Sequence, residues 1–320
     1  MYSTIYHNPY YGNDFFEFFI TLYNRLPFIF RSLDWYSDEI QVVSFILLGI
    51  SCSFIGCCLV AKQMTMLANS LSHTVLVGII MAFYCLNKHT PIQNLSDIPF
   101  HYLLLAALMS GILTVSLIEI SHKLLKVQKD AANGITFTFL FALGIILATT
   151  LTKNVHIGIE AIMGNADMLS IIEVKRLSYT TIINGLFCLA FFRPLFLSSF
   201  DLNFAQSINF FPKRVDSLLL LLTALTAIIG FRAVGVILLL GFLVIPPLLA
   251  QLYVTKMKNL IITSILFSFL SSLLGVALSN HFLFYYNIPL STGGVVTVLM
   301  SLTYLITLSV KYSIKRIRKL

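Results

Sequence analysis

Residues 215–254 read VDSLLLLLTALTAIIGFRAVGVILLLGFLVIPPLLAQLYV and decide the fold class. Asp216 and Arg232 are the only charged residues in this stretch. Because a membrane-spanning helix needs about 20 consecutive apolar residues, the stretch is long enough for two spans, at 215–231 and 234–254. The connection between the two is very short, which leaves open that one of them is short, broken or re-entrant.

Similar apolar stretches recur along the whole chain, at 40–61, 66–87, 101–121, 131–152, 177–199, 259–281 and 293–311. Of the 320 residues, 58% are hydrophobic and only 11% are charged. A soluble globular domain carries about 25% charged residues. A chain this poor in charge cannot cover a water-facing surface, so lipid must be its main solvent. The sequence therefore predicts an all-α polytopic membrane protein with eight or nine transmembrane helices.

The distribution of basic residues predicts the orientation of these spans. With the N-terminus outside and nine spans, the inside segments hold about twice as many Lys and Arg residues as the outside segments. The last span is followed directly by a basic run, Lys311, Lys315, Arg316, Arg318 and Lys319. We therefore expect a cytoplasmic C-terminus. The net charge of +8 indicates membrane anchoring and not nucleic-acid binding, because the bases form no soluble patch.

Three regions follow from these patterns. Residues 1–39 form an N-terminal extension rich in aromatic residues, with an interfacial helix expected from Phe15 to Arg31 because aromatic rings favour the lipid headgroup level. Residues 40–311 form the transmembrane domain, and residues 312–320 form a basic cytoplasmic tail.

The second predicted span carries two polar residues that could contact a cation. Asn69 and His73 lie four residues apart, so a helix places both on one face. A histidine inside a membrane span usually faces the bundle interior or a water-filled path, and imidazole binds zinc, iron, manganese and copper alike. A structural histidine that is hydrogen-bonded to a neighbouring helix is the alternative for His73.

A short amphipathic segment follows the fifth predicted span. Phe200, Phe204, Ala205 and Ile208 are spaced for one face of a helix, and Asp201 follows Phe200. A cytoplasmic amphipathic helix between two spans is a suitable docking surface for a soluble partner. A loop lying on the surface is the alternative.

The span at 234–254 contains Pro246 and Pro247. Proline removes a backbone donor, and in a membrane the carbonyl groups that it frees must face protein or a cavity. We therefore predict that Gly235, Pro246 and Pro247 belong to a kinked helix that lines a pathway and does not face lipid.

Five stretches, in their order along the chain, resemble motifs of the integral-membrane permease family of bacterial ABC importers for manganese, zinc and iron. The first is similar to M-x-L-x-x-D-x-x-S-H-x-x-L-x-G and the second to D-A-A-x-G-x-x-F. The third resembles H-x-x-x-x-x-x-G-N, the fourth F-D-x-x-x-A, and the fifth V-G-x-x-L-x-x-x-x-L-x-I-P. The matching residues include Met64, His73, Gly78, Asp130, Gly134, His156, Asn165, Phe200, Asp201, Ala205, Val234, Gly235 and Pro246.

The resemblance implies a type II importer-like permease in the inner membrane of a bacterial cell. It implies a second permease copy in a homo- or heterodimer, a cytoplasmic ATP-binding subunit and an extracytoplasmic metal-binding protein. It also implies that residues 200–210 form the helix that couples the permease to the ATPase, and that His73 contacts the metal. The family aspartate is Asn69 here, which indicates weaker and faster metal passage, a carboxylate supplied by a partner, or a different substrate.

The expected function is the translocation pathway of an ATP-driven importer for manganese, zinc or iron, with the metal as cargo and no permanently bound cofactor. The sequence contains no P-loop motif and no nucleophile–base cluster, so the chain is expected to have no enzymatic activity of its own. A permease for a metal chelate such as a siderophore or cobalamin remains an alternative. An ion-coupled secondary transporter is a weaker one, because mid-span carboxylates are scarce.

Overall fold

The structure is a computed structural model that describes residues 8–31, 35–65, 70, 74, 77–78, 80–81, 83–85, 100–151, 166–200 and 212–317. These residues form helices and no strand, which confirms the all-helical class. The helices are α1 (Phe15–Arg31), α2 (Ser37–Ala61), α4 (Phe100–Leu125), α5 (Lys129–Leu151), α7 (Ile171–Ala190), α8 (Phe192–Phe200), α10 (Pro212–Val234), α11 (Val236–Tyr253), α12 (Met257–Tyr286) and α13 (Thr292–Ile317).

Several of these helices are long and apolar enough to cross a membrane. Within the described residues they are α2, α10, α11, α12 and α13, and α7 with α8 makes a sixth if that bent pair is one span. Helices α4 and α5 each contain a shorter apolar segment, at Leu108–His122 and Ala131–Leu147. Most of the predicted span at 66–87 lies outside the described residues. The predicted count of eight or nine is compatible with this set.

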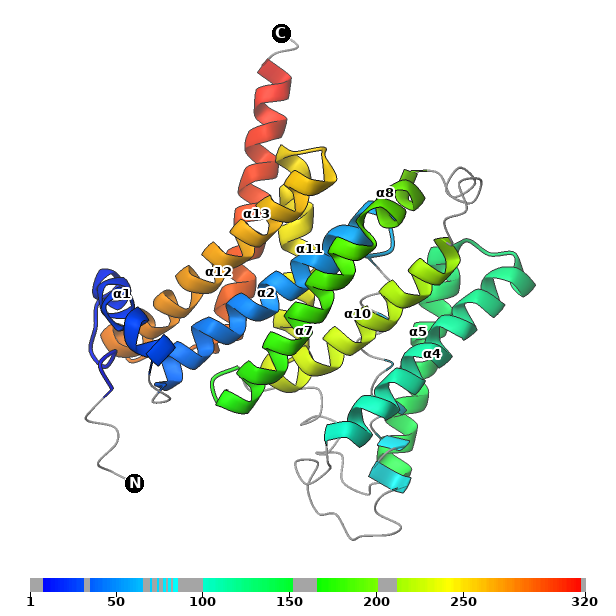
Figure 1. The fold of residues 1–320 in the computed structure, drawn as a ribbon, viewed down its shortest axis with the longest axis horizontal. Helices are drawn as coiled ribbons and strands as arrows, with labels where there is room; N and C mark the ends of the chain where they lie inside the picture. Colours follow the sequence, from blue (N-terminus) through cyan, green and yellow to red (C-terminus); the bar gives the residue numbers. More distant parts are fainter. Residues whose placement is uncertain are drawn as a thin grey trace.

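Helix α2 lies at the centre of the bundle and packs against α7, α11 and α12 (Figure 1). Its side chains are buried around most of its circumference, which is typical of a helix enclosed by other helices. Three helices are joined by one buried amide, because Asn184 of α7 donates to Ser51 of α2 at 2.7 Å and to Thr226 of α10 at 2.8 Å. These bonds satisfy polar groups that lipid could not.

The bundle has two ends, which we name after the helices found there (Figure 1). The α1 end holds the start of α2, the end of α12 and the connection from α10 to α11. The α8 end holds the end of α2, the start of α10 and the connection from α11 to α12. The predicted orientation would place the α1 end outside the cell and the α8 end in the cytoplasm.

The fifth predicted span, 177–199, differs from the structure. Helix α7 begins earlier, at Ile171, where Ser170 and Glu173 form a capping box. The helix stops at Ala190, and α8 continues at an angle of 69° to it. Pro194 explains the break, because it has no N–H to bond the carbonyl of Ala190 and is tolerated in the first turn of a new helix. The predicted span therefore begins before residue 177 and is bent at Phe191.

For the pair at 215–231 and 234–254, the sequence left open that one span is short, broken or re-entrant, and the structure has two long helices here. Helices α10 and α11 both reach the length of a span, and Gly235 alone connects them. Gly235 has φ 87° and ψ 171°, a conformation that is almost restricted to glycine. The absence of a Cβ at this position lets two long helices follow each other with one connecting residue.

Helices α4 and α5 form a second, smaller region. They pack against each other, and α4 also packs against α10 (Figure 1). Many of their large apolar side chains are exposed, including Leu105, Met109, Phe139 and Ile146. In a chain of this composition such exposure indicates contact with lipid or with another membrane subunit.

Candidate functional site

At the α8 end, three helices meet at one buried lysine. The Nζ of Lys62, just past the end of α2, forms an ion pair with Asp216 of α10. It also donates to the hydroxyl of Ser198 in α8 at 2.6 Å. The Lys62 side chain is 4% exposed and that of Asp216 is 21% exposed. A lysine buried to this degree needs a carboxylate partner to keep its charge, and Asp216 provides it.

The chain changes direction directly after Lys62 and enters the stretch that contains the predicted metal contacts. Gln63 has φ 57°, and the amide of Met64 bonds the carbonyl of Leu59 at 2.8 Å. Further along, Thr114 of α4 donates to the buried Thr74 at 2.9 Å. Gly78 lies so close to α4 that a Cβ there would meet the Ser110 side chain at 2.9 Å. Thr74 and Gly78 therefore both contact α4.

On another face of α4, a cavity of about 230 Å³ lies between α4 and α10. Its polar lining consists of Glu119 and Ser116 from α4 and Ser217 from α10. Carboxylate and hydroxyl oxygens suit hard divalent cations, and a carboxylate in a membrane span usually faces a pathway. Ser217 follows Asp216 in sequence, but neither Asp216 nor Lys62 lines the cavity.

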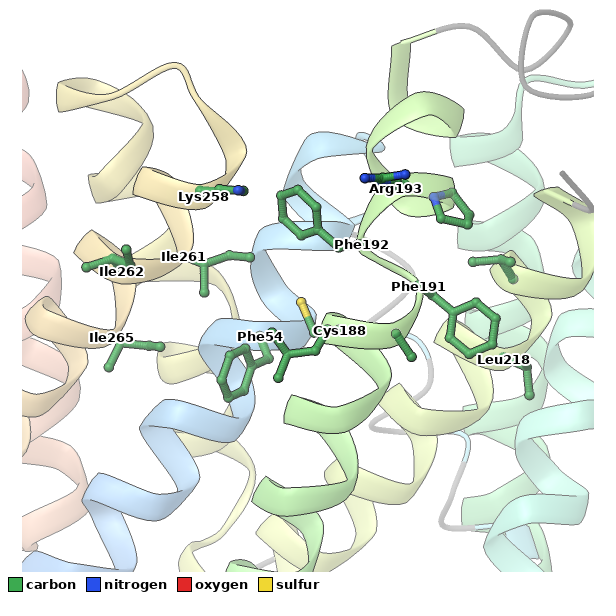
Figure 2. Close-up of a pocket in the computed structure, with 14 residues that line it drawn as sticks. Phe54, Cys188, Phe191, Phe192, Arg193, Leu218, Lys258, Ile261, Ile262 and Ile265 are labelled. Atoms are coloured by element: carbon green, nitrogen blue, oxygen red, sulfur yellow. The ribbon is translucent and has the colours of Figure 1, made fainter. Parts of the chain in front are cut away.

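A larger groove of about 1050 Å³ opens where α7 bends into α8. Figure 2 shows Lys258 and Arg193 at one end of it, on either side of Phe192. Its walls are apolar, and among the described residues its lining holds no carboxylate and no imidazole. Two cations at the mouth of an apolar groove repel a divalent cation, so this groove is unsuited to metal passage.

Helix α11 carries the predicted pathway residues Gly235, Pro246 and Pro247. The helix is continuous through both prolines, and both are buried. Pro247 has no N–H for the carbonyl of Leu243, and this carbonyl points at Gly56 of α2. A Cβ at residue 56 would collide with that oxygen and lie 2.9 Å from the ring of Pro247. The prolines therefore shape a close contact between α11 and α2.

The α1 end is held by a polar network that joins the N-terminal extension to the bundle. Glu39 is fully buried, pairs with Arg25 of α1, and accepts from the hydroxyl of Tyr10 at 3.1 Å. Asp38 accepts from Asn8 and from Asn280 of α12, each at 2.8 Å. Burial, together with the charge of Glu39, raises the pKa of Tyr10 above its usual value.

A second set of polar contacts at the same end is centred on Asp167. This carboxylate accepts from the amide of Gln41 at 3.3 Å and from the hydroxyl of Thr292 at the start of α13. It therefore joins the segment before α7 to α2 and α13. Although acids gather at this end, the described part of the chain contains no group of three or more His, Cys, Asp or Glu side chains arranged to hold a metal ion.

A family model described as "ABC 3 transport family" matches residues 40–311. The chain belongs to the ABC 3 transport family. As a member it is the membrane component of an ABC transport system, with the helical bundle just described as its transmembrane part.

Relatives of this ABC 3 permease have been named for metal transport. The chain is 35% identical over 305 residues to a "Probable metal transport system membrane protein" of Chlamydia muridarum, with 94% of each chain covered. It is 30% identical over 243 residues to the "Manganese transport system membrane protein MntD" of Bacillus subtilis, which covers 72% of this chain and 79% of the relative.

Among solved structures, the permease is similar in fold to "PsaBC from Streptococcus pneumoniae in complex with Fab". The TM-score is 0.70 at 23% identity, with 86% of this chain and 91% of the other covered. The likeness supports the predicted class of an ABC importer-like permease for the fold.

Several predicted site residues of the permease lie outside the described residues. They are the metal contacts Asn69 and His73 and the coupling residues Asp201, Phe204 and Ala205. Phe200 is described as the last residue of α8. Gly235, Pro246 and Pro247 are described, and their role in lining a pathway stays a prediction.

The lysine pair at the α8 end was not predicted from the sequence. Neither Lys62 nor Asp216 was assigned a role, although an acid one residue into an apolar stretch was a usable signal. A charge placed at the edge of a span usually has a partner of opposite charge. Here the two partners, Lys62 and Asp216, are 154 residues apart in sequence. Sequence spacing alone does not reveal such a pair.

Proposed function

We propose that the chain forms the translocation pathway of an ATP-driven importer for a divalent transition-metal ion, which is manganese, zinc or iron. The observation that carries the proposal is membership of the ABC 3 transport family across 40–311. Relatives named for metal and manganese transport support the choice of cargo.

The charges of the two cavities support a route for a cation through one of them. The α4–α10 cavity is lined by Glu119 and hydroxyl oxygens, whereas the α7–α8 groove carries Arg193 and Lys258. A divalent cation is attracted to the first and repelled by the second. We therefore propose a route for the cation that includes the α4–α10 cavity. His73 and Asn69 are proposed as transient contacts of the metal because they match the family motif, and not because of a position in the structure.

The energy for this transport comes from a separate subunit. The chain has no P-loop motif, so a cytoplasmic ATP-binding subunit must hydrolyse ATP. We propose that this subunit docks on residues 200–210 at the α8 end, and that an extracytoplasmic metal-binding protein delivers the ion at the α1 end. A second permease copy, identical or related, completes the pore. The permease then alternates between two states, each open to one side.

Uptake of radiolabelled manganese by whole cells tests the proposal. Cells that express the permease with its ATP-binding subunit and metal-binding protein should accumulate the ion, and His73→Ala should lower uptake to the level of cells without the permease. His122→Ala is the matched control, because His122 bonds the backbone oxygen of Val127 at 2.7 Å and does not line the α4–α10 cavity. Equal uptake by wild type and His73→Ala would remove His73 from the route.

Competition in the same assay separates the ion from a metal chelate as cargo. An excess of free Mn²⁺ or Zn²⁺ should suppress uptake, whereas ferric siderophore or cobalamin should not. Suppression by the chelates alone would favour the chelate permease. Uptake that persists when the P-loop lysine of the ATP-binding subunit is changed would instead favour an ion-coupled secondary transporter.

A further inference from the structure

The ammonium group of Lys62 contacts both flanks of the segment proposed to dock on the ATPase. Ser198 lies two residues before the end of α8, where the chain leaves the described bundle. Asp216 lies in the first turns of α10, where the chain re-enters it at Pro212. Residues 201–211 therefore begin and end at helices that are held by the same Nζ atom.

Lys62 also lies at the start of the stretch proposed to contact the metal. It follows the last residue of α2 and precedes the left-handed turn at Gln63. Later in the same stretch, Thr74 and Gly78 contact α4. One side chain thus joins the flanks of the docking segment to the beginning of the metal-contacting stretch.

The chemistry of lysine suits such a junction. An ammonium has three donors on a flexible stem, so it can bond two helices at once and keep one bond while the other changes. Its burial makes the loss of both partners unfavourable, because an unpaired charge would remain in an apolar surrounding. A displacement of α8 relative to α10 therefore changes the contacts of Lys62, which lies next to the turn at Gln63.

We propose that Lys62 is a positioning residue that transmits movement from the ATPase-docking segment to the metal-contacting stretch, through Ser198 on one flank and Asp216 on the other. The inference rests on the proposed function. It predicts that loss of the Lys62 junction uncouples ATP hydrolysis from transport without preventing assembly.

The number of ions transported per ATP hydrolysed tests this role. The permease is reconstituted in proteoliposomes with its ATP-binding subunit and metal-binding protein, and Mn²⁺ uptake and phosphate release are measured together. Lys62→Met should assemble with the ATP-binding subunit and hydrolyse ATP, but transport severalfold fewer ions per ATP. Lys62→Arg, which keeps the charge and can bond both partners, should retain most of the wild-type ratio.

Lys256→Met is the matched control, because Lys256 is an exposed lysine at the same end of the bundle. It should leave the ratio unchanged. A wild-type ratio in Lys62→Met, or equal losses in Lys62→Met and Lys62→Arg, would overturn the inference. A wild-type complex that hydrolyses ATP and moves no divalent metal would instead overturn the proposed function.

If Lys62→Met does not accumulate in the membrane, Ser198→Ala tests the role of Lys62 instead. This variant keeps the ion pair with Asp216 and removes only the contact with α8. A lower ratio of ions to ATP at normal expression supports transmission through Lys62. An unchanged ratio overturns it.

Discussion

The two ends of the bundle each contain a buried ion pair, but the surroundings of the two pairs differ. At the α1 end the buried partner is the acid Glu39, and Arg25, the Tyr10 hydroxyl and the Tyr36 amide all contact it. At the α8 end the buried partner is the base Lys62, with Asp216 and Ser198 as its contacts. The first pair sits in a dense network, and the second is a junction between helices.

This difference indicates at which end of the bundle the helices can move with the loss of fewer polar contacts. At the α1 end, Asp38 and Asp167 add further contacts that join the N-terminal extension, α2, α12 and α13. Movement there would break several polar bonds at once. At the α8 end, α8 is a short helix at an angle of 69° to α7, and its polar contact with α2 passes through Lys62. We expect changes at the α1 end to alter stability and changes at the α8 end to alter coupling.

Arg25→Met should produce the largest loss of stability. It leaves the fully buried Glu39 without its cationic partner, and breaking a buried pair in this way costs about 3 kcal/mol of the free energy of unfolding. Thermal unfolding in detergent can be followed by the fluorescence of Trp35, the only tryptophan, which lies beside Tyr36.

The double variant Arg25→Met with Glu39→Leu should recover much of that loss, because it removes the unpaired charge as well. In whichever of these two variants folds, the number of ions transported per ATP hydrolysed should stay near the wild-type value. A stable Arg25→Met protein with a reduced ratio would reverse the assignment of roles to the two ends.

Gly56→Ala should have the next largest effect, because α2 connects the two ends and passes α11 at this residue. The added methyl group would collide with the Leu243 carbonyl, and such overpacking costs about 2 kcal/mol. Gly134→Ala is the control, since a Cβ there meets nothing within 4 Å and alanine favours a helix. Equal unfolding temperatures for the two variants would show that α2 and α11 separate without loss of stability.

Tyr10→Phe should have a smaller effect that depends on pH. Loss of the hydrogen bond to Glu39 costs about 1 kcal/mol at neutral pH. Burial, and then the charge of Glu39, raises the pKa of Tyr10 in the folded protein above the usual value of about 10. The folded state therefore favours the neutral phenol, and this contribution to stability is complete below about pH 10 and is lost as pH rises further.

Unfolding temperatures measured from pH 8 to 11 check this prediction. The wild-type temperature should fall more steeply above about pH 10 than that of Tyr10→Phe. Tyr11→Phe, at an exposed neighbouring residue, should follow the wild-type curve. Identical slopes for wild type and Tyr10→Phe would contradict the account of the α1 end.

The parts of the fold that the sequence predicted are those that depend on composition. Long apolar stretches can only be helices in lipid, so the helical class and the range of α1 from Phe15 to Arg31 were predictable. The bend at Phe191 was missed because apolar character continues through it, and Pro194 was not weighed. The connection predicted between residues 231 and 234 lies at Gly235 instead, because glycine allows a connection of a single residue there.

The candidate site was less predictable for a different reason. Motif spacing singled out His73 and Phe200 because their neighbours along the chain form a pattern. Lys62 and Asp216 have no such pattern, since their contact depends on how α2 and α10 pack. The Tyr10–Glu39 bond is likewise a contact between the N-terminal extension and α2 that spacing does not encode.

Transport by the purified complex tests the central claim most directly. Proteoliposomes containing the permease and its ATP-binding subunit are loaded with a manganese-sensitive dye, with ATP inside and the metal-bound binding protein outside. The account predicts accumulation of Mn²⁺ that requires both ATP and the binding protein, on opposite faces. Accumulation without ATP that follows an imposed proton gradient would contradict it.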